Sequence, residues 1–128
     1  MTANPHIGGL ILELTLPKPF SVNAMRTDRH KTARAYAIWQ DAARQEIMAQ
    51  GPRLLIEPPV MVEIIFPSAA CSPQCDTDNQ AKCILDALVS MKILPDDNRM
   101  IVPVLLLRWG PSHQTTVRIH EFLGEMFG

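Results

Sequence analysis

The sequence has no long apolar run and few cysteines, and both absences restrict what the protein can be. No apolar stretch reaches the roughly 18 residues needed to cross a membrane. Residues 1–16 also lack the basic segment and apolar core of a signal peptide. We therefore expect a cytoplasmic protein without a membrane segment, in which the three cysteines are reduced thiols rather than a disulfide framework.

The clustering of the cysteines makes zinc an alternative to consider. Cys71, Cys75 and Cys83 have the spacing C-x3-C-x7-C, and no histidine lies near them in the sequence. Structural zinc sites typically have four Cys or His ligands in closely spaced pairs. The pattern therefore favours small, partly buried side chains beside a loop, and an interaction module with a structural zinc stays open as an alternative.

The chain also lacks an excess of positive charge. It has 12 basic and 13 acidic residues and a formal net charge of −1, which by itself does not indicate binding to nucleic acid. The charges are nevertheless segregated, because residues 18–34 hold five basic side chains and one acid, whereas residues 76–97 hold five acids and two lysines. One basic and one acidic segment are thus candidates for function.

Length and hydrophobic pattern predict a single domain over residues 1–128. Runs of β-branched and alternating apolar residues predict strands over residues 10–16, 60–66, 100–108 and 114–121. Apolar residues at helical spacing predict helices over about residues 32–49 and 78–91. The order β-α-β-α-β-β therefore predicts an α/β (α+β) fold, in which one mixed sheet packs with two helices.

Individual residues refine this fold prediction. Thr32 is a candidate N-cap of the first helix. The strand over residues 60–66 is nearly all apolar, which is typical of a strand buried on both faces. Pro103 has no amide donor, so the third strand is expected at an edge or a bulge of the sheet. The core-facing stripe of the first helix is expected to consist of Tyr36, Trp39, Ala43 and Ile47.

The acidic segment contains the most informative pattern. Asp76 and Asp78 are separated by one residue at the expected junction of a loop and a helix, so both carboxylates can face one point. Lys82 follows Asp78 by four residues and shares its helix face. Asp97 comes after a turn, and the chain can bring it back to the same place.

Carboxylates brought this close repel one another unless protons or cations intervene. Mg²⁺ prefers oxygen ligands, retains waters for a substrate phosphate and lowers the pKa of a bound water. An ammonium such as that of Lys82 adds a positive charge for the transition state of phosphodiester hydrolysis. Three plainer interpretations stay open: Asp78 as a helix cap, residues 96–98 as a turn, and Lys82 with Asp86 as a surface ion pair.

Three motifs resemble a known family. Residues 75–88 have the sequence C-D-T-D-N-Q-A-K-C-I-L-D-A-L, and residues 93–102 have I-L-P-D-D-N-R-M-I-V. An N-terminal motif, L-P-K-P-F-S-V-N, occupies residues 16–23. Together they resemble the RusA family of Holliday junction resolvases, which are crossover junction endodeoxyribonucleases, and the similarity extends over residues 10–121.

The resemblance implies a homodimer that binds four-way DNA junctions and resolves them by paired symmetric nicks in DNA recombination and repair. It matches Asp76, Asp78 and Asp97 to the metal-binding acids, with Mg²⁺ or Mn²⁺ as the cofactor. It matches Lys82 to the essential lysine. The expected mechanism is direct hydrolysis by an activated water, without a covalent enzyme intermediate.

Neighbouring positions leave alternatives within this resemblance. Asp96 lies directly before Asp97, and the register favours the second acid as the ligand. Asn79 and Asp86 also match family positions, where packing and capping are alternatives to chemistry.

The basic segment is the expected contact with DNA phosphates. A solvated loop and helix start is the alternative for these side chains, and the near-neutral net charge predicts weak or salt-sensitive binding. A catalytically inactive or differently specific branched-DNA-binding protein is the alternative function. The candidate DNA-binding residues are Asn23, Arg26, Arg29, His30, Lys31 and Arg34.

Overall fold

The computed structural model describes residues 7–18, 29–51, 55–69 and 77–124, and for residues 29–32 and 77–79 it describes the backbone alone. Within these ranges the helices and strands follow one another in the predicted order. Neither of the described helices is long and apolar enough to span a lipid bilayer. The elements are β1 (Ile7–Leu16), α1 (Arg29–Ala49), β2 (Val60–Pro67), α2 (Thr77–Ser90), β3 (Val104–Gly110) and β4 (Thr115–Phe122).

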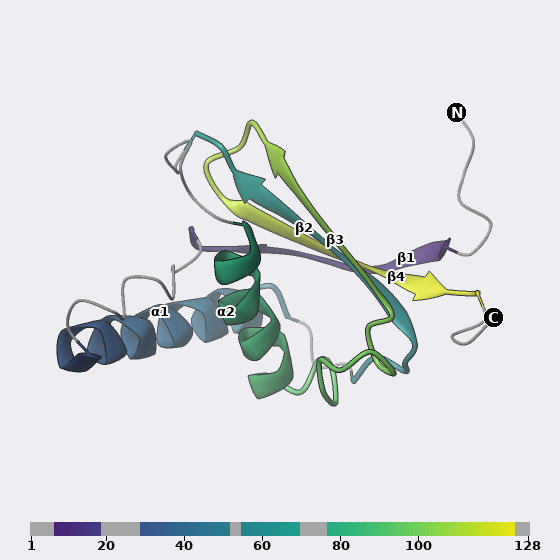
Figure 1. Ribbon diagram of the computed structural model, residues 1–128, viewed down its shortest axis with the longest axis horizontal. Helices are drawn as coiled ribbons and strands as arrows, with labels where there is room; N and C mark the ends of the chain where they lie inside the picture. The colour runs from purple at the N-terminus through teal and green to yellow at the C-terminus, as the bar shows by residue number, and fades with distance from the viewer. Residues whose placement is uncertain (1–6, 19–28, 52–54, 70–76, 125–128) are drawn as a thin grey trace.

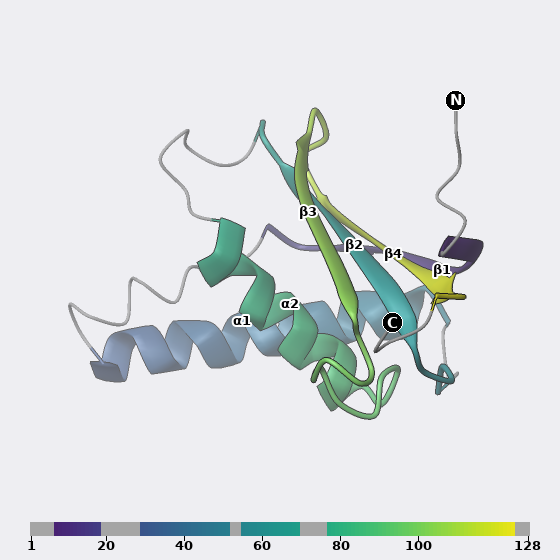
Figure 2. The same cartoon turned by 45° about the vertical axis from the view of Figure 1, so that its right-hand side comes forward.

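The strands form one mixed sheet in the order β1-β4-β2-β3. Strand β4 runs antiparallel to β1 and β2, whereas β2 and β3 are parallel, so a crossover must join them, and α2 lies in that crossover. Both helices lie on the same side of the sheet (Figures 1 and 2). The predicted fold, a mixed sheet with two helices, is confirmed.

The hydrophobic core lies between the sheet and the two helices. Alternate side chains of β2, from Val60 to Phe66, are fully buried on the helix side of the sheet. They pack with the apolar faces of α1 and α2, which fixes both helices relative to the sheet. The buried side chains from the helices include Trp39, Ala43, Ile47, Ile84 and Leu88. All of these except Ile84 were predicted from helical spacing.

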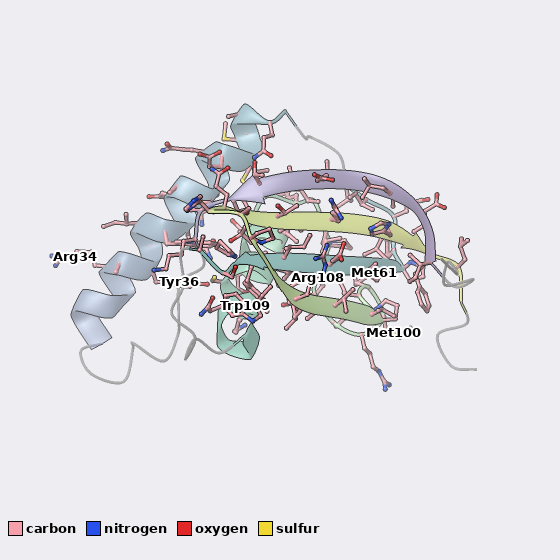
Figure 3. The ribbon with its side chains drawn as sticks, turned by 90° about the horizontal axis from the view of Figure 1, so that it is seen from above. Arg34, Tyr36, Met61, Met100, Arg108 and Trp109 are labelled. Carbon is pink, nitrogen blue, oxygen red and sulfur yellow. The ribbon has the colours of Figure 1, made fainter. Side chains whose placement is uncertain are left out.

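Charged side chains, rather than a helix, shield the opposite face of β2. Glu63 on β2 accepts a hydrogen bond from Arg108 Nε on β3 at 2.8 Å and lies 3.7 Å from Arg118 Nη1 on β4. Arg118 also donates to Glu13 on β1 at 3.1 Å, so alternating charges cross the sheet. Figure 3 labels Arg108 on β3 and Met61 on β2. The arginine stems cover the central strand, and β2 is buried throughout, as its nearly all-apolar sequence predicted.

The first helix begins earlier than predicted. Its first residue is Arg29, so Thr32 lies inside the helix and the prediction that Thr32 caps it is wrong. Residues 29–31 are polar and show no apolar periodicity, which is why the helix was expected to begin only at about residue 32. Arginine and lysine are nevertheless good helix formers, and no proline or glycine interrupts them.

The third strand begins later than predicted, at Val104. The side-chain oxygen of Asn98 accepts hydrogen bonds from the amides of Met100 at 2.9 Å and Ile101 at 3.2 Å, and this closes a turn where a strand was expected. Pro103 directly precedes the strand. The prediction of an edge position is confirmed, since β3 is the last strand in the sheet order.

Substitution of a core residue of β2 tests this packing. We expect Ile64→Ala to lower the free energy of unfolding by about 3 kcal/mol, because the Ile64 side chain is fully buried and the cavity left behind cannot close. Leu106→Ala on β3 is the control, since Leu106 is 45% exposed and should cost less than about 1 kcal/mol. Urea unfolding of the three proteins measures both values. Equal losses for the two variants would contradict the described core.

Candidate active site

An open cavity of about 310 Å³ lies between α2 and β3. Of the described side chains that line it, two are polar, and both were predicted to be catalytic. Lys82 comes from α2, and Asp97 comes from the turn that follows the helix. The lining residues are Ala81, Lys82, Leu85, Asp97, Leu105 and Leu107.

The end of α2 sends the chain back toward the cavity. Lys92 adopts a left-handed backbone conformation with a φ of 60°, and the Ile93 amide donates to the carbonyl of Leu88 at 3.0 Å. This is a Schellman turn, which reverses the chain at a helix end. Ile93 and Leu94 are then buried in the core. Their burial anchors the segment that carries Asp97 beside α2.

The two neighbouring acids after this turn have different surroundings. Asp96 accepts a hydrogen bond from the Asp97 amide through Oδ1 at 2.7 Å, and from the Asn98 side-chain amide through Oδ2 at 3.2 Å. Both carboxylate oxygens of Asp96 therefore stabilise the turn. The partly buried Asp97 lines the cavity instead. This difference supports the choice of Asp97 over Asp96 that the sequence register favoured.

Lys82 reaches the cavity from the exposed face of α2. Its side chain is 65% exposed, and Nζ lies 3.5 Å from Oδ1 of Asp86, one helical turn later. The surface ion pair that the sequence suggested is thus present. An exposed pair of this length contributes little to stability, so the pair does not give Lys82 a role in stabilising the fold.

Asp86 also connects α2 to α1. The hydroxyl of Tyr36 on α1 donates to Asp86 Oδ2 at 2.8 Å. The Gln40 side-chain amide donates to the Tyr36 hydroxyl at 2.9 Å and to the Cys83 carbonyl at 3.2 Å. Burial, followed by the hydrogen bond to Asp86, raises the pKa of Tyr36 well above its ordinary value. Tyr36 therefore stays protonated and remains the donor.

Sequence reasoning missed this connection. Tyr36 was predicted only as a member of the core stripe of α1, and Asp86 as a partner of Lys82 and as a family position with no assigned contact. Gln40 lies one helical turn after Tyr36, which is the only local signal that the two side chains meet.

The remaining predicted acids are described less fully. Asp78 lies in the first turn of α2, one turn before Lys82, and its side chain is outside the described residues. Asp76 also lies outside them. Among the residues that the structure describes, no group of three or more His, Cys, Asp or Glu side chains is close enough to hold a metal ion. Asp97 is thus the predicted ligand whose side chain is described.

The predicted DNA-binding residues lie along and before the start of α1. Asn23 and Arg26 are outside the described residues, and Arg29, His30 and Lys31 belong to the beginning of α1, where only the backbone is described. A sixth candidate, Arg34, is exposed and points away from the sheet, whereas Tyr36 points inward (Figure 3).

One of the clustered cysteines is a core residue. Cys83 is fully buried, and its thiol donates to the Gln80 carbonyl at 3.0 Å. The prediction of a partly buried side chain underestimated this burial. Cys71 and Cys75 lie outside the described residues.

Comparison with known families identifies the class of this protein. A family profile described as "Endodeoxyribonuclease RusA" matches residues 17–120. The matched region is most of the chain and includes both helices and the whole lining of the cavity. The chain therefore belongs to the RusA family, whose members are endodeoxyribonucleases that act on Holliday junctions. A comparison with curated protein sequences found no significant match.

Proposed function

We propose that this protein is a Mg²⁺- or Mn²⁺-dependent endonuclease that resolves four-way DNA junctions by paired symmetric nicks, in DNA recombination and repair. The observation that carries the proposal is that Lys82 and Asp97 line one open cavity, next to the helix whose first turn contains Asp78. A lysine and a carboxylate at one surface opening suit a substrate phosphate and the cation that accompanies it.

The chemistry of the donors fits a hard divalent cation. Asp97 offers a partly buried carboxylate to the cavity, and we assign Asp76 and Asp78 as the other two ligands. Oxygen ligands of this type suit Mg²⁺ and Mn²⁺. A cation held by these carboxylates would supply charge neutralisation at the scissile phosphate and would lower the pKa of the attacking water.

The protein's own residues then have distinct roles. Lys82 places its ammonium against the phosphate and stabilises the negative charge that develops on the phosphate oxygens. The apolar side chains of Leu85, Leu105 and Leu107 line the cavity beside Lys82 and offer the ammonium no competing polar group. Water attacks phosphorus directly, the bond to the leaving oxygen breaks, and no covalent enzyme intermediate forms.

The proposed substrate also explains a dimer. A four-way junction has approximate two-fold symmetry, and a C2 dimer places two equal active sites on opposed strands. We assign the phosphate contacts to the basic segment, which includes the exposed Arg34. A catalytically inactive or differently specific branched-DNA-binding protein is the alternative.

Cleavage of a cruciform plasmid tests the proposal. We expect the purified protein with Mg²⁺ or Mn²⁺ to convert the plasmid mainly to the linear form, because paired nicks across the junction cut both strands of the plasmid. A single nick gives the open circle instead, and a linear duplex of the same sequence is the control substrate. EDTA should abolish the reaction. Absence of metal-dependent cleavage of any branched DNA would rule out the nuclease and leave the binding protein.

The neighbouring acids provide a matched pair of variants. We expect Asp97→Asn to lower kcat by about 100-fold or more, because a carboxylate at the cavity is lost. Asp96→Asn should lower kcat by less than about fivefold, since an asparagine oxygen can still accept the hydrogen bond that closes the turn. Single-turnover cleavage of a labelled junction measures both. Similar losses in the two variants would contradict the separate roles of the acids.

A second matched pair tests the DNA-binding face. We expect Arg34→Ala to weaken junction binding and to reduce the slope of log affinity against log salt concentration by about one. Arg44→Ala is the control on the same helix, because Arg44 is already paired with Asp41 at 3.0 Å. Fluorescence anisotropy at several salt concentrations gives the slopes. An unchanged slope for Arg34→Ala would remove Arg34 from the interface.

A further inference from the structure

The Lys82 side chain is flexible, so its ammonium needs a fixed partner to stay in one position. Its ammonium ends a flexible stem with several rotatable bonds, and the side chain is largely exposed on α2. A charge that must meet a phosphate is effective only when it is already oriented, because misplacement by about 1 Å can cost roughly 100-fold in rate. Among the described residues that line the cavity, Asp97 is the one other polar side chain, and the rest are apolar.

A chain of hydrogen bonds from α1 supplies a fixed acceptor. The two hydrogens of the Gln40 amide are both used, one by the Tyr36 hydroxyl and one by the Cys83 carbonyl of α2. The Tyr36 oxygen therefore accepts from Gln40, and its single proton is left for Asp86 Oδ2 at 2.8 Å. Each donor in the chain has a defined direction.

The consequence is a defined orientation for Asp86. With Oδ2 bound by Tyr36, the carboxylate turns Oδ1 toward Lys82, whose Nζ lies 3.5 Å away. The strong donor in this chain comes from α1, on which the half-buried Tyr36 points inward (Figure 3). The position of Lys82 thus depends on how α1 packs against α2.

We infer that Tyr36 and Asp86 are positioning residues that hold the Lys82 ammonium at the mouth of the cavity. This inference rests on the proposed function, because the ammonium is placed for a phosphate. Asp86 and Tyr36 act only through Lys82 and do not touch the substrate. Both helices also contribute buried side chains to the common core, including Trp39 and Leu88, so loss of the chain should alter rate much more than stability.

Steady-state kinetics of three variants test the inference. We expect Asp86→Asn to lower kcat about tenfold and Tyr36→Phe about threefold, with KM for the junction changed less than about twofold. Asp41→Asn is the control, because this carboxylate on α1 pairs with Arg44 and should leave kcat unchanged. Thermal unfolding should show that all three variants are folded.

A double-variant cycle separates positioning from a structural role. If Asp86 acts through Lys82, then Asp86→Asn should not reduce kcat further once Lys82→Ala is present. Multiplied losses in the double variant, or a wild-type kcat for Asp86→Asn, would overturn the inference while leaving the nuclease assignment intact.

A measurement without DNA tests the geometry itself. The side-chain NMR signal of Lys82 (¹H–¹³Cε) should move in Asp86→Asn, and should move in the same direction but less in Tyr36→Phe. Asp41→Asn should leave it in place. If the wild-type protein cleaves no DNA, the proposed function fails, and this signal still decides whether the chain places Lys82. An unchanged Lys82 chemical shift in both variants would overturn the positioning role.

Discussion

The candidate site depends on one local constraint, the burial of Ile93 and Leu94 where the chain leaves α2. The left-handed Lys92 allows the reversal, and the apolar pair after it enters the core, which holds the turn against the helix. Asp97 follows within a few residues and therefore cannot lie far from Lys82. Carboxylate and ammonium are thus brought together by apolar burial nearby rather than by their own attraction, which is weak at an exposed surface.

Hydrophobic pattern made the fold predictable from the sequence. Apolar faces of helices and strands are expected to pack inside the protein. The stripe of α1 (Trp39, Ala43 and Ile47) and the apolar run of β2 are both buried in this way. The start of α1 at Arg29 could not be predicted in this way, because its first residues contact no core. The start of β3 could not be predicted either, since the Asn98 side chain competes with the strand for backbone amides.

Motif and chain reversal together made part of the site predictable. The chain reversal between Lys82 and Asp97 indicated that the two side chains belong to one site, and both line the cavity. The choice between Asp96 and Asp97 depends on the hydrogen bonds of the turn, which spacing alone does not contain. The contact of Tyr36 with Asp86 joins residues far apart in the sequence. No local pattern encodes such a contact, because it follows from the packing of α1 against α2.

The charged groups of this protein fall into two arrangements with different consequences. On the open face of the sheet, Glu63 is nearly buried between Arg108 and Arg118, which neutralise its charge. Removing either arginine would leave a poorly solvated carboxylate, which is costly. Lys82 has the opposite character: its pairing with Asp86 is exposed and long, and water screens it.

That weakness suits the role proposed for Lys82, in which its ammonium moves from Asp86 to a substrate phosphate. A phosphate approaching the cavity offers Lys82 a stronger acceptor than Asp86, and little free energy is lost when the first pair opens. Asp86 does not follow the ammonium, because its other oxygen is held by Tyr36 at 2.8 Å. In the proposed role, the ammonium is kept near the cavity before substrate arrives and is released to the phosphate at small cost. A deeply buried ion pair would hold Lys82 more firmly, and its opening would cost much more free energy.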